Sequence, residues 1–214
     1  MSPDPYILTP EETDELELTA LVRHRLEEQF ANLEQQHAAA TLGMWIFLAT
    51  EVMFFGGLFA AYFTLKAEAR VWPPPGVELE TGLSAIFTLF LIASSGTMVL
   101  AVRSLERGDR RATVSWILVT FGLGGLFLAN QIREFYSLDF RVSSNSYGSI
   151  YYLMTGFHAL HVAAGLLLMV VALAIATGPG PVERRAPVVD SIGYYWHIVD
   201  VVWIGLFTTI FIIR

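Results

Sequence analysis

The chain has 214 residues, of which 54% are hydrophobic and only 15% are charged, whereas soluble domains carry roughly 25% charged residues. This composition excludes an ordinary soluble domain and is typical of a protein that crosses a membrane several times. Because the sequence has no cysteine, it also excludes disulfide bonds and the attachment of a metal or haem through a thiolate.

The net charge of −7 is concentrated at the start of the chain. Residues 1–38 hold nine acidic residues and two arginines, which give −7 by themselves, so the remaining residues are balanced. Thr9 and Pro10 predict the start of a helix, because threonine caps helices and proline is favoured in the first turn. We expect an acidic extension, either a surface helix reaching about His37 or a disordered tail, followed by a membrane domain over residues 39–214.

Five apolar segments follow, each about as long as the 20 residues that a helix needs to cross a membrane. They cover residues 41–64, 82–103, 113–134, 149–176 and 190–213. The connections are short, and the first contains the proline run after Trp72, which cannot be helical. The sequence therefore predicts an all-α polytopic membrane protein, a five-helix transmembrane bundle with a polar N-terminal extension.

The basic residues predict how this bundle is oriented. Eight arginines flank the spans on the side of the N-terminus, and five basic residues flank them on the other side. Because lysine and arginine are enriched in cytoplasmic loops, we expect the N-terminus inside and the C-terminus outside, in a bacterial plasma membrane.

Five ionisable side chains lie within the predicted spans at similar depth: Glu51, His158, His161, His197 and Asp200. His158 and His161 are three residues apart, as are His197 and Asp200, and this spacing places each pair on one helix face. Ionisable groups in a membrane normally face other protein groups, so we expect interhelical hydrogen bonds that hold the bundle. For Glu51, about 15 Å into its span, two interpretations stay open: a structural hydrogen bond and a proton-linked role.

Four further side chains complete the predicted set of buried polar and structural residues. Trp196 and Trp203 are seven residues apart and therefore share a helix face. Gln131 and Glu134 lie at the end of the third span and are most simply a contact with a partner or a helix cap. The residues alone indicate no catalytic site, no metal site and no nucleic-acid partner.

Several stretches, in one order along residues 41–214, resemble subunit III of haem–copper oxidases, and that of cytochrome c oxidase in particular. They are Thr50-Glu51-Val52 with Phe54-Phe55, Trp72-Pro73-Pro74, Glu106-Arg107-Gly108-Asp109-Arg110, Gln131 with Glu134, Tyr147-Gly148-Ser149 with Thr155-Gly156-Phe157-His158-Ala159-Leu160-His161-Val162, and Tyr195-Trp196-His197-Ile198-Val199-Asp200-Val201-Val202-Trp203.

The resemblance implies a non-catalytic core subunit of an aa3-type cytochrome c oxidase of the aerobic respiratory chain. Such a subunit carries no haem or copper itself, and haem a and copper are expected in partner subunits. The resemblance also implies contact with oxidase subunits I and II, structural phospholipids, and support for assembly and for proton uptake by subunit I. The family position that matches Glu51 is a carbodiimide-reactive carboxylate, which favours the proton-linked role.

The chain departs from many family members in its number of spans, and its motifs also bear on the alternatives. Many family members have seven spans and this chain lacks the first two, so their lipid-holding cleft would be absent or formed with another subunit. Subunit III of a quinol oxidase and the accessory subunit of nitric oxide reductase are disfavoured by Glu51 and by Trp72-Pro73-Pro74. A proton-linked transporter would show inverted repeats and broken helices, and the sequence has neither. Membership of a larger respiratory supercomplex stays open.

Overall fold

The computed structural model describes residues 33–178 and 182–213, and within these residues every regular element is helical. The predicted helix that starts after Thr9, and most of the acidic extension 1–38, lie outside the described residues. The chain divides into two units, Met1–Ile46 and Phe47–Arg214, and the packing described below is that of the second unit.

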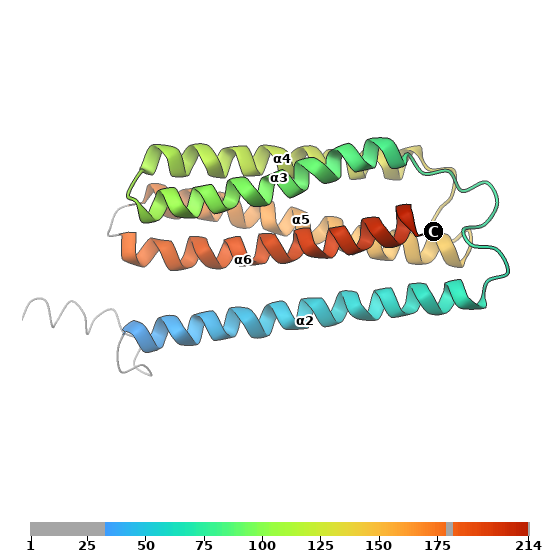
Figure 1. The fold of residues 1–214 in the computed structure, drawn as a ribbon, viewed down its shortest axis with the longest axis horizontal. Coiled ribbons are helices and arrows are strands. Elements are labelled where there is room, and N and C mark those ends of the chain that lie inside the picture. Colours follow the sequence, from blue (N-terminus) through green and yellow to red (C-terminus); the bar gives the residue numbers. More distant parts are fainter. Residues whose placement is uncertain (1–32, 179–181, 214) are drawn as a thin grey trace, which may run out of the picture. The chain divides into compact units, whose positions relative to one another are not determined.

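Five long helices make up the described chain: α2 (Leu33–Glu68), α3 (Thr81–Glu106), α4 (Arg110–Ser137), α5 (Ser146–Thr177) and α6 (Val182–Phe207), which continues as the short π-helix η1 (Thr208–Ile212) (Figure 1). Each corresponds to one predicted apolar segment and extends beyond it at one or both ends. All five are long and apolar enough to cross a membrane. The predicted fold class, an all-helical membrane protein with five spans, is confirmed.

Two of the helices begin at polar residues that cap them, outside the apolar segments. Asp109 Oδ1 accepts a hydrogen bond from the backbone N–H of Ala112 (3.0 Å) before α4, and Asn145 Oδ1 accepts one from that of Gly148 (2.8 Å) before α5. Gly108 has a φ of 76° in the turn between α3 and α4, a conformation that strains other residues. The two caps and the glycine turn therefore fix where α3 ends and where α4 and α5 begin.

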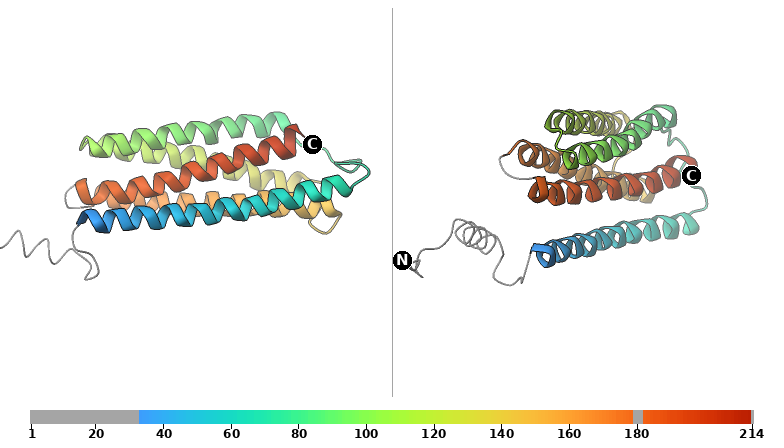
Figure 2. Two further views of the ribbon diagram at one scale, coloured as in Figure 1. Left: turned by 60° about the horizontal axis from the view of Figure 1, so that its bottom comes forward. Right: turned by 60° about the vertical axis from the view of Figure 1, so that its left-hand side comes forward.

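The second unit is built on a ring of four helices in which α3 and α5 each pack against both α4 and α6 (Figures 1 and 2). The part of α2 from Phe47 onward contacts α6, since the rings of Phe47 and Tyr195 stack with centroids 6.3 Å apart. At the other end of α2, Tyr62 donates a hydrogen bond to the backbone oxygen of Thr209 (3.3 Å). The predicted proline turn is non-helical and is joined to α2 by Trp72 Nε1, which donates to Tyr62 Oη (2.9 Å).

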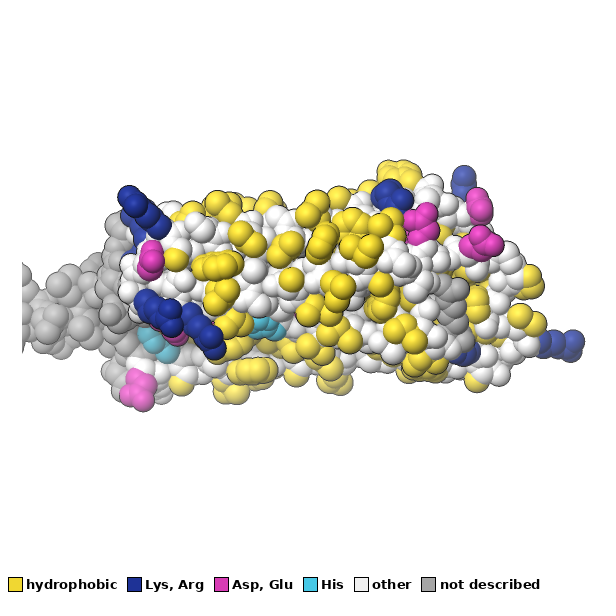
Figure 3. Space-filling model, turned by 45° about the horizontal axis from the view of Figure 1, so that its top comes forward, with side chains coloured by type: hydrophobic (Ala, Val, Ile, Leu, Met, Phe, Trp, Pro, Cys, Tyr) yellow, Lys and Arg dark blue, Asp and Glu magenta, His cyan; other side chains and the backbone are white. Residues whose placement is uncertain are grey.

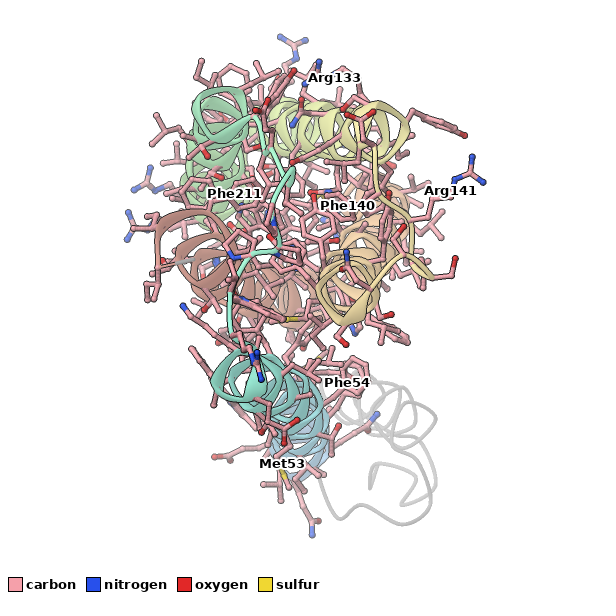
Figure 4. The ribbon with its side chains drawn as sticks, turned by 90° about the vertical axis from the view of Figure 1, so that its right-hand side faces the viewer. Met53, Phe54, Arg133, Phe140, Arg141 and Phe211 are labelled. Carbon is pink, nitrogen blue, oxygen red and sulfur yellow. The ribbon has the colours of Figure 1, made fainter. Side chains whose placement is uncertain are left out.

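The surface of the second unit is apolar between two charged ends. On the face that Figure 3 shows, Lys, Arg, Asp and Glu side chains gather at the ends, and hydrophobic side chains cover the region between them. Seen along the helices in Figure 4, Met53 points away from the ring and is 76% exposed, whereas Phe140 and Phe211 lie among the helices and are 8% and 4% exposed. An exposed apolar belt of this kind is the surface that a lipid bilayer covers.

Candidate functional site

The proton-linked candidate Glu51 forms an ion pair or hydrogen bond with His161, across α2 and α5. Glu51 Oε2 lies 2.9 Å from His161 Nε2, and His161 Nδ1 lies 2.7 Å from the backbone oxygen of Phe157. A carbonyl oxygen can only accept, so Nδ1 carries a proton and Nε2 meets Glu51. One shared proton then completes the contact, on the carboxyl group or on Nε2. The two side chains therefore share a single proton in this contact.

Aromatic side chains and a small cavity surround this pair. The ring of Phe54 stacks on His161 at 6.3 Å between centroids, that of Phe55 meets it edge-on at 5.1 Å, and Tyr195 donates to the backbone oxygen of His161 (3.0 Å). The side chains of Glu51 and His161 are 22% and 19% exposed. The adjoining cavity has a volume of about 10 Å³, which holds one water molecule at most and no cofactor.

His158, one turn before His161, lies in a box of aromatic rings. It is fully buried, it stacks on Trp203 at 4.8 Å between ring centroids, and it meets the edge of Phe127 at 5.9 Å. Neither ring nitrogen has a hydrogen-bond partner among the described residues. The expected interhelical hydrogen bond of His158 is therefore not found there, because its neighbours offer π-faces and ring edges in place of polar atoms.

His197 and Asp200 do reach a common partner, as their spacing on one helix face predicts. Ser95 on α3 lies with its Oγ 2.9 Å from His197 Nδ1, and the same hydroxyl donates a hydrogen bond to Asp200 Oδ2. Asp200 is 4% exposed and its second oxygen, Oδ1, has no partner among the described residues. These contacts join α3 to α6 through polar groups in the middle of both spans.

Trp196 and Trp203 also contact α3, each through its indole N–H. Trp196 donates to Ser94 Oγ and Trp203 to Thr88 Oγ1, both at 2.9 Å, and the two rings are 0% and 1% exposed. The three side chains on α3 that hold α6, at positions 88, 94 and 95, were missed by the sequence analysis. Hydroxyl residues at helical spacing in an otherwise apolar span are the signal that would find them.

Gln131 and Glu134 are buried within the ring and make no contact at the surface. They are 1% and 3% exposed, and Ser84 on α3 donates to Glu134 Oε2 (3.3 Å). Glu134 also lines a cavity of about 250 Å³, between the loop that precedes α3 and the end of α4. Both residues therefore belong to the predicted set of buried polar residues, and the hydrogen bond of Glu134 joins α3 to α4.

No three His, Cys, Asp or Glu side chains lie together as a possible metal site in the described ranges 33–178 and 182–213. The arrangement instead comprises a proton-holding pair, an enclosed histidine and a polar seam between α3 and α6. A family model described as "Cytochrome c oxidase subunit III" matches residues 28–213. The chain belongs to the cytochrome c oxidase subunit III family.

Individual relatives of this subunit III chain support the same assignment. A protein named "Probable cytochrome c oxidase subunit 3" from Mycobacterium tuberculosis is 43% identical over 181 residues, which cover 81% of this chain and 88% of that protein. Proteins named "Cytochrome c oxidase subunit 3" from Thermostichus vulcanus and Synechocystis sp. are 38% and 36% identical over 173 residues, and 86% and 74% of their lengths are covered.

The resemblance inferred from the motifs is thereby confirmed. As a subunit III family member, the chain is an integral membrane protein and part of an oxidoreductase complex with other oxidase subunits.

Proposed function

We propose that this chain is the non-catalytic third subunit of an aa3-type cytochrome c oxidase, packed against subunit I in a complex that also contains subunit II. Haem a and copper are held by those partners, and electrons do not pass through this chain. The histidines within the spans support this proposal, because each already contacts other side chains of this chain. His161 contacts Glu51, His197 contacts Ser95, and His158 is enclosed by aromatic rings. The cavity beside His158 and His161 is too small for a haem.

The contact that carries the proposed role is that between Glu51 and His161. In an apolar environment the separated charges of an ion pair are costly, which favours the proton on the carboxyl group. We propose that Glu51 is protonated at rest and that the pair sustains proton uptake into subunit I. The 22% exposure of the Glu51 side chain supports this role, since it leaves the pair open to a neighbouring subunit through which a proton can reach it.

Glu51→Gln tests this proposal in the purified complex. The glutamine amide donates a hydrogen bond to His161 Nε2 but cannot release a proton, so the subunit stays in the complex while proton uptake and oxygen consumption slow. Glu78→Gln, which removes an exposed carboxyl group outside the spans, is the control and leaves both rates unchanged. An unchanged rate of proton uptake in Glu51→Gln contradicts the role of the pair. An infrared spectrum without a protonated carboxyl band assigned to Glu51 contradicts its resting state.

We place the chain in a bacterial plasma membrane with its N-terminus inside and with phospholipids against its apolar belt. The cluster Arg107, Arg110 and Arg111 between α3 and α4 supports this orientation, since short basic loops stay in the cytoplasm. Arg110 donates to the backbone oxygen of Thr177, and Arg185 donates to that of Ala176 (2.9 Å). Arg110 and Arg185 thus satisfy backbone carbonyls at the C-terminus of α5. Mass spectrometry of lipid retained by the purified complex tests the phospholipid.

A further inference from the structure

The hydrogen bonds of Ser95 favour one position for the proton of His197. With Asp200 Oδ2 as the acceptor, Ser95 uses its single hydroxyl hydrogen there and accepts a hydrogen bond from His197 Nδ1, 2.9 Å away. Nδ1 is therefore protonated, and Nε2 of the neutral imidazole is left as a hydrogen-bond acceptor.

This acceptor faces outward near the middle of the membrane. At a rise of 1.5 Å per residue, His197 lies about 18 Å from Arg185 and about 22 Å from Ile212, the two ends of its span. His197 is half-buried. Its Nε2 has no hydrogen-bond partner among the described residues, and this atom is not buried. Lipid tails offer no donor at this depth, so a donor to this nitrogen would have to come from another chain.

The side chains around His197 form an otherwise apolar surface that another helix could approach. On α6, Val201 and Ile204 follow His197 at helical spacing and are 63% and 44% exposed. On α3, Ile92 is 43% exposed, and the exposed Gly96 has no atom within 4 Å of the position where a Cβ would stand. In Figures 1 and 2, α6 runs between α3 and α2, so this surface lies along the seam of α3 and α6. We name it the His197 patch: Ile92, Ser95, Gly96, His197, Val201 and Ile204.

We propose that the His197 patch docks a transmembrane helix of another oxidase subunit, and that this helix presents a hydrogen-bond donor to His197 Nε2. The donor is a hydroxyl group or the N–H of an indole or a side-chain amide. Apolar side chains of the partner cover Val201 and Ile204, and the missing side chain at Gly96 permits close approach of the two backbones. The inference rests on the proposed assembly into an oxidase, because that assembly supplies the partner helix.

A photo-cross-linking amino acid, p-benzoylphenylalanine, in place of Val201 identifies what covers the patch in the intact, mildly solubilised complex. The expected product joins this chain to another oxidase subunit. The same amino acid in place of Leu167, a 70% exposed residue on α5, gives the background of a position outside the patch. A cross-link only to lipid, or only to a second copy of this chain, overturns the proposal. If haem-containing partners co-purify but are not cross-linked, only the docking proposal fails. If no haem-containing partner co-purifies, the proposed function fails as well.

Two substitutions of His197 then separate the outward contact from the inward one. In His197→Asn the amide reaches only the position of Nδ1, so the contact with Ser95 is kept and the outward acceptor is lost. In His197→Gln the amide reaches the position of Nε2. We expect the asparagine variant to fold, as circular dichroism of the isolated chain would report, but to be retained about fivefold less per haem a on detergent washing. The glutamine variant keeps more of the wild-type retention. Equal retention of wild type and His197→Asn overturns the proposed donor.

Discussion

Trp196 occupies a slot between two glycines, and adding one methyl group to either glycine should destabilise the bundle. A Cβ at Gly165 on α5 would stand 2.7 Å from two carbons of the Trp196 ring, and a Cβ at Gly124 on α4 would stand 2.7 Å and 2.8 Å from two others. Ordinary carbon contacts are 3.5–4.0 Å, so the ring must move by about 1 Å. A ring that moves away from one glycine approaches the other.

The expected cost of Gly165→Ala is that of an overpacked core, about 1–3 kcal/mol in the free energy of unfolding. If the shift also breaks the hydrogen bond from Trp196 Nε1 to Ser94, about 1 kcal/mol is added. Gly125→Ala is the matched control, because nothing lies within 4 Å of its Cβ position. Since alanine favours a helix over glycine by up to about 1 kcal/mol, the control should be neutral or stabilising.

Unfolding of the purified chain by sodium dodecyl sulfate in mixed micelles, followed by circular dichroism, measures both variants. The two alanine substitutions should shift the midpoint in opposite directions, or Gly165→Ala alone should lower it. If Gly165→Ala unfolds at the same detergent fraction as Gly125→Ala, the slot does not exist as described.

Three further predictions concern the seam, the surface and the orientation. Ser95→Ala removes the shared partner of His197 and Asp200 and should lower the free energy of unfolding by about 1–3 kcal/mol in the same assay. Asp200→Leu should weaken retention of the subunit in the detergent-extracted complex. Wild-type values for both variants would refute the polar seam. Arg133→Ala removes an exposed ion pair with Glu80 and should change stability by less than about 1 kcal/mol; a larger loss would mean that this pair is structural. Arg111→Cys creates the single thiol of a cysteine-free chain and should react with a membrane-impermeant maleimide only in inverted vesicles, whereas labelling from outside would reverse the orientation.

The spans could be predicted from the sequence because hydropathy and length act on each segment by itself. The start of α6 was less predictable: the apolar pattern begins at residue 190, but the helix begins at Val182 and includes Pro187. Pro187 is the sixth residue of α6, so it removes the backbone hydrogen bond to the carbonyl four residues earlier, and the helix nevertheless runs through it. A prediction from the apolar pattern alone therefore starts this helix too late.

The sequence predicts which side chains share a face of one helix, but not which side chains of another helix they contact. The spacing of His197 and Asp200 places both on one face, and both indeed meet Ser95. That His161 meets Glu51, 110 positions away, depends on which helices are neighbours, and hydropathy carries no such information. His158 shows the same limit, because a buried histidine on a polar-looking face proved to be enclosed by aromatic rings from three other helices.

A reduced-minus-oxidised optical spectrum of the complex that co-purifies with this chain in mild detergent tests the central claim most directly. The proposed function predicts haem a bands together with oxygen consumption driven by cytochrome c. Haem b or haem o alone would contradict it and move the chain to a quinol oxidase or a nitric oxide reductase. An intact preparation with no haem at all would contradict the assignment to an oxidase.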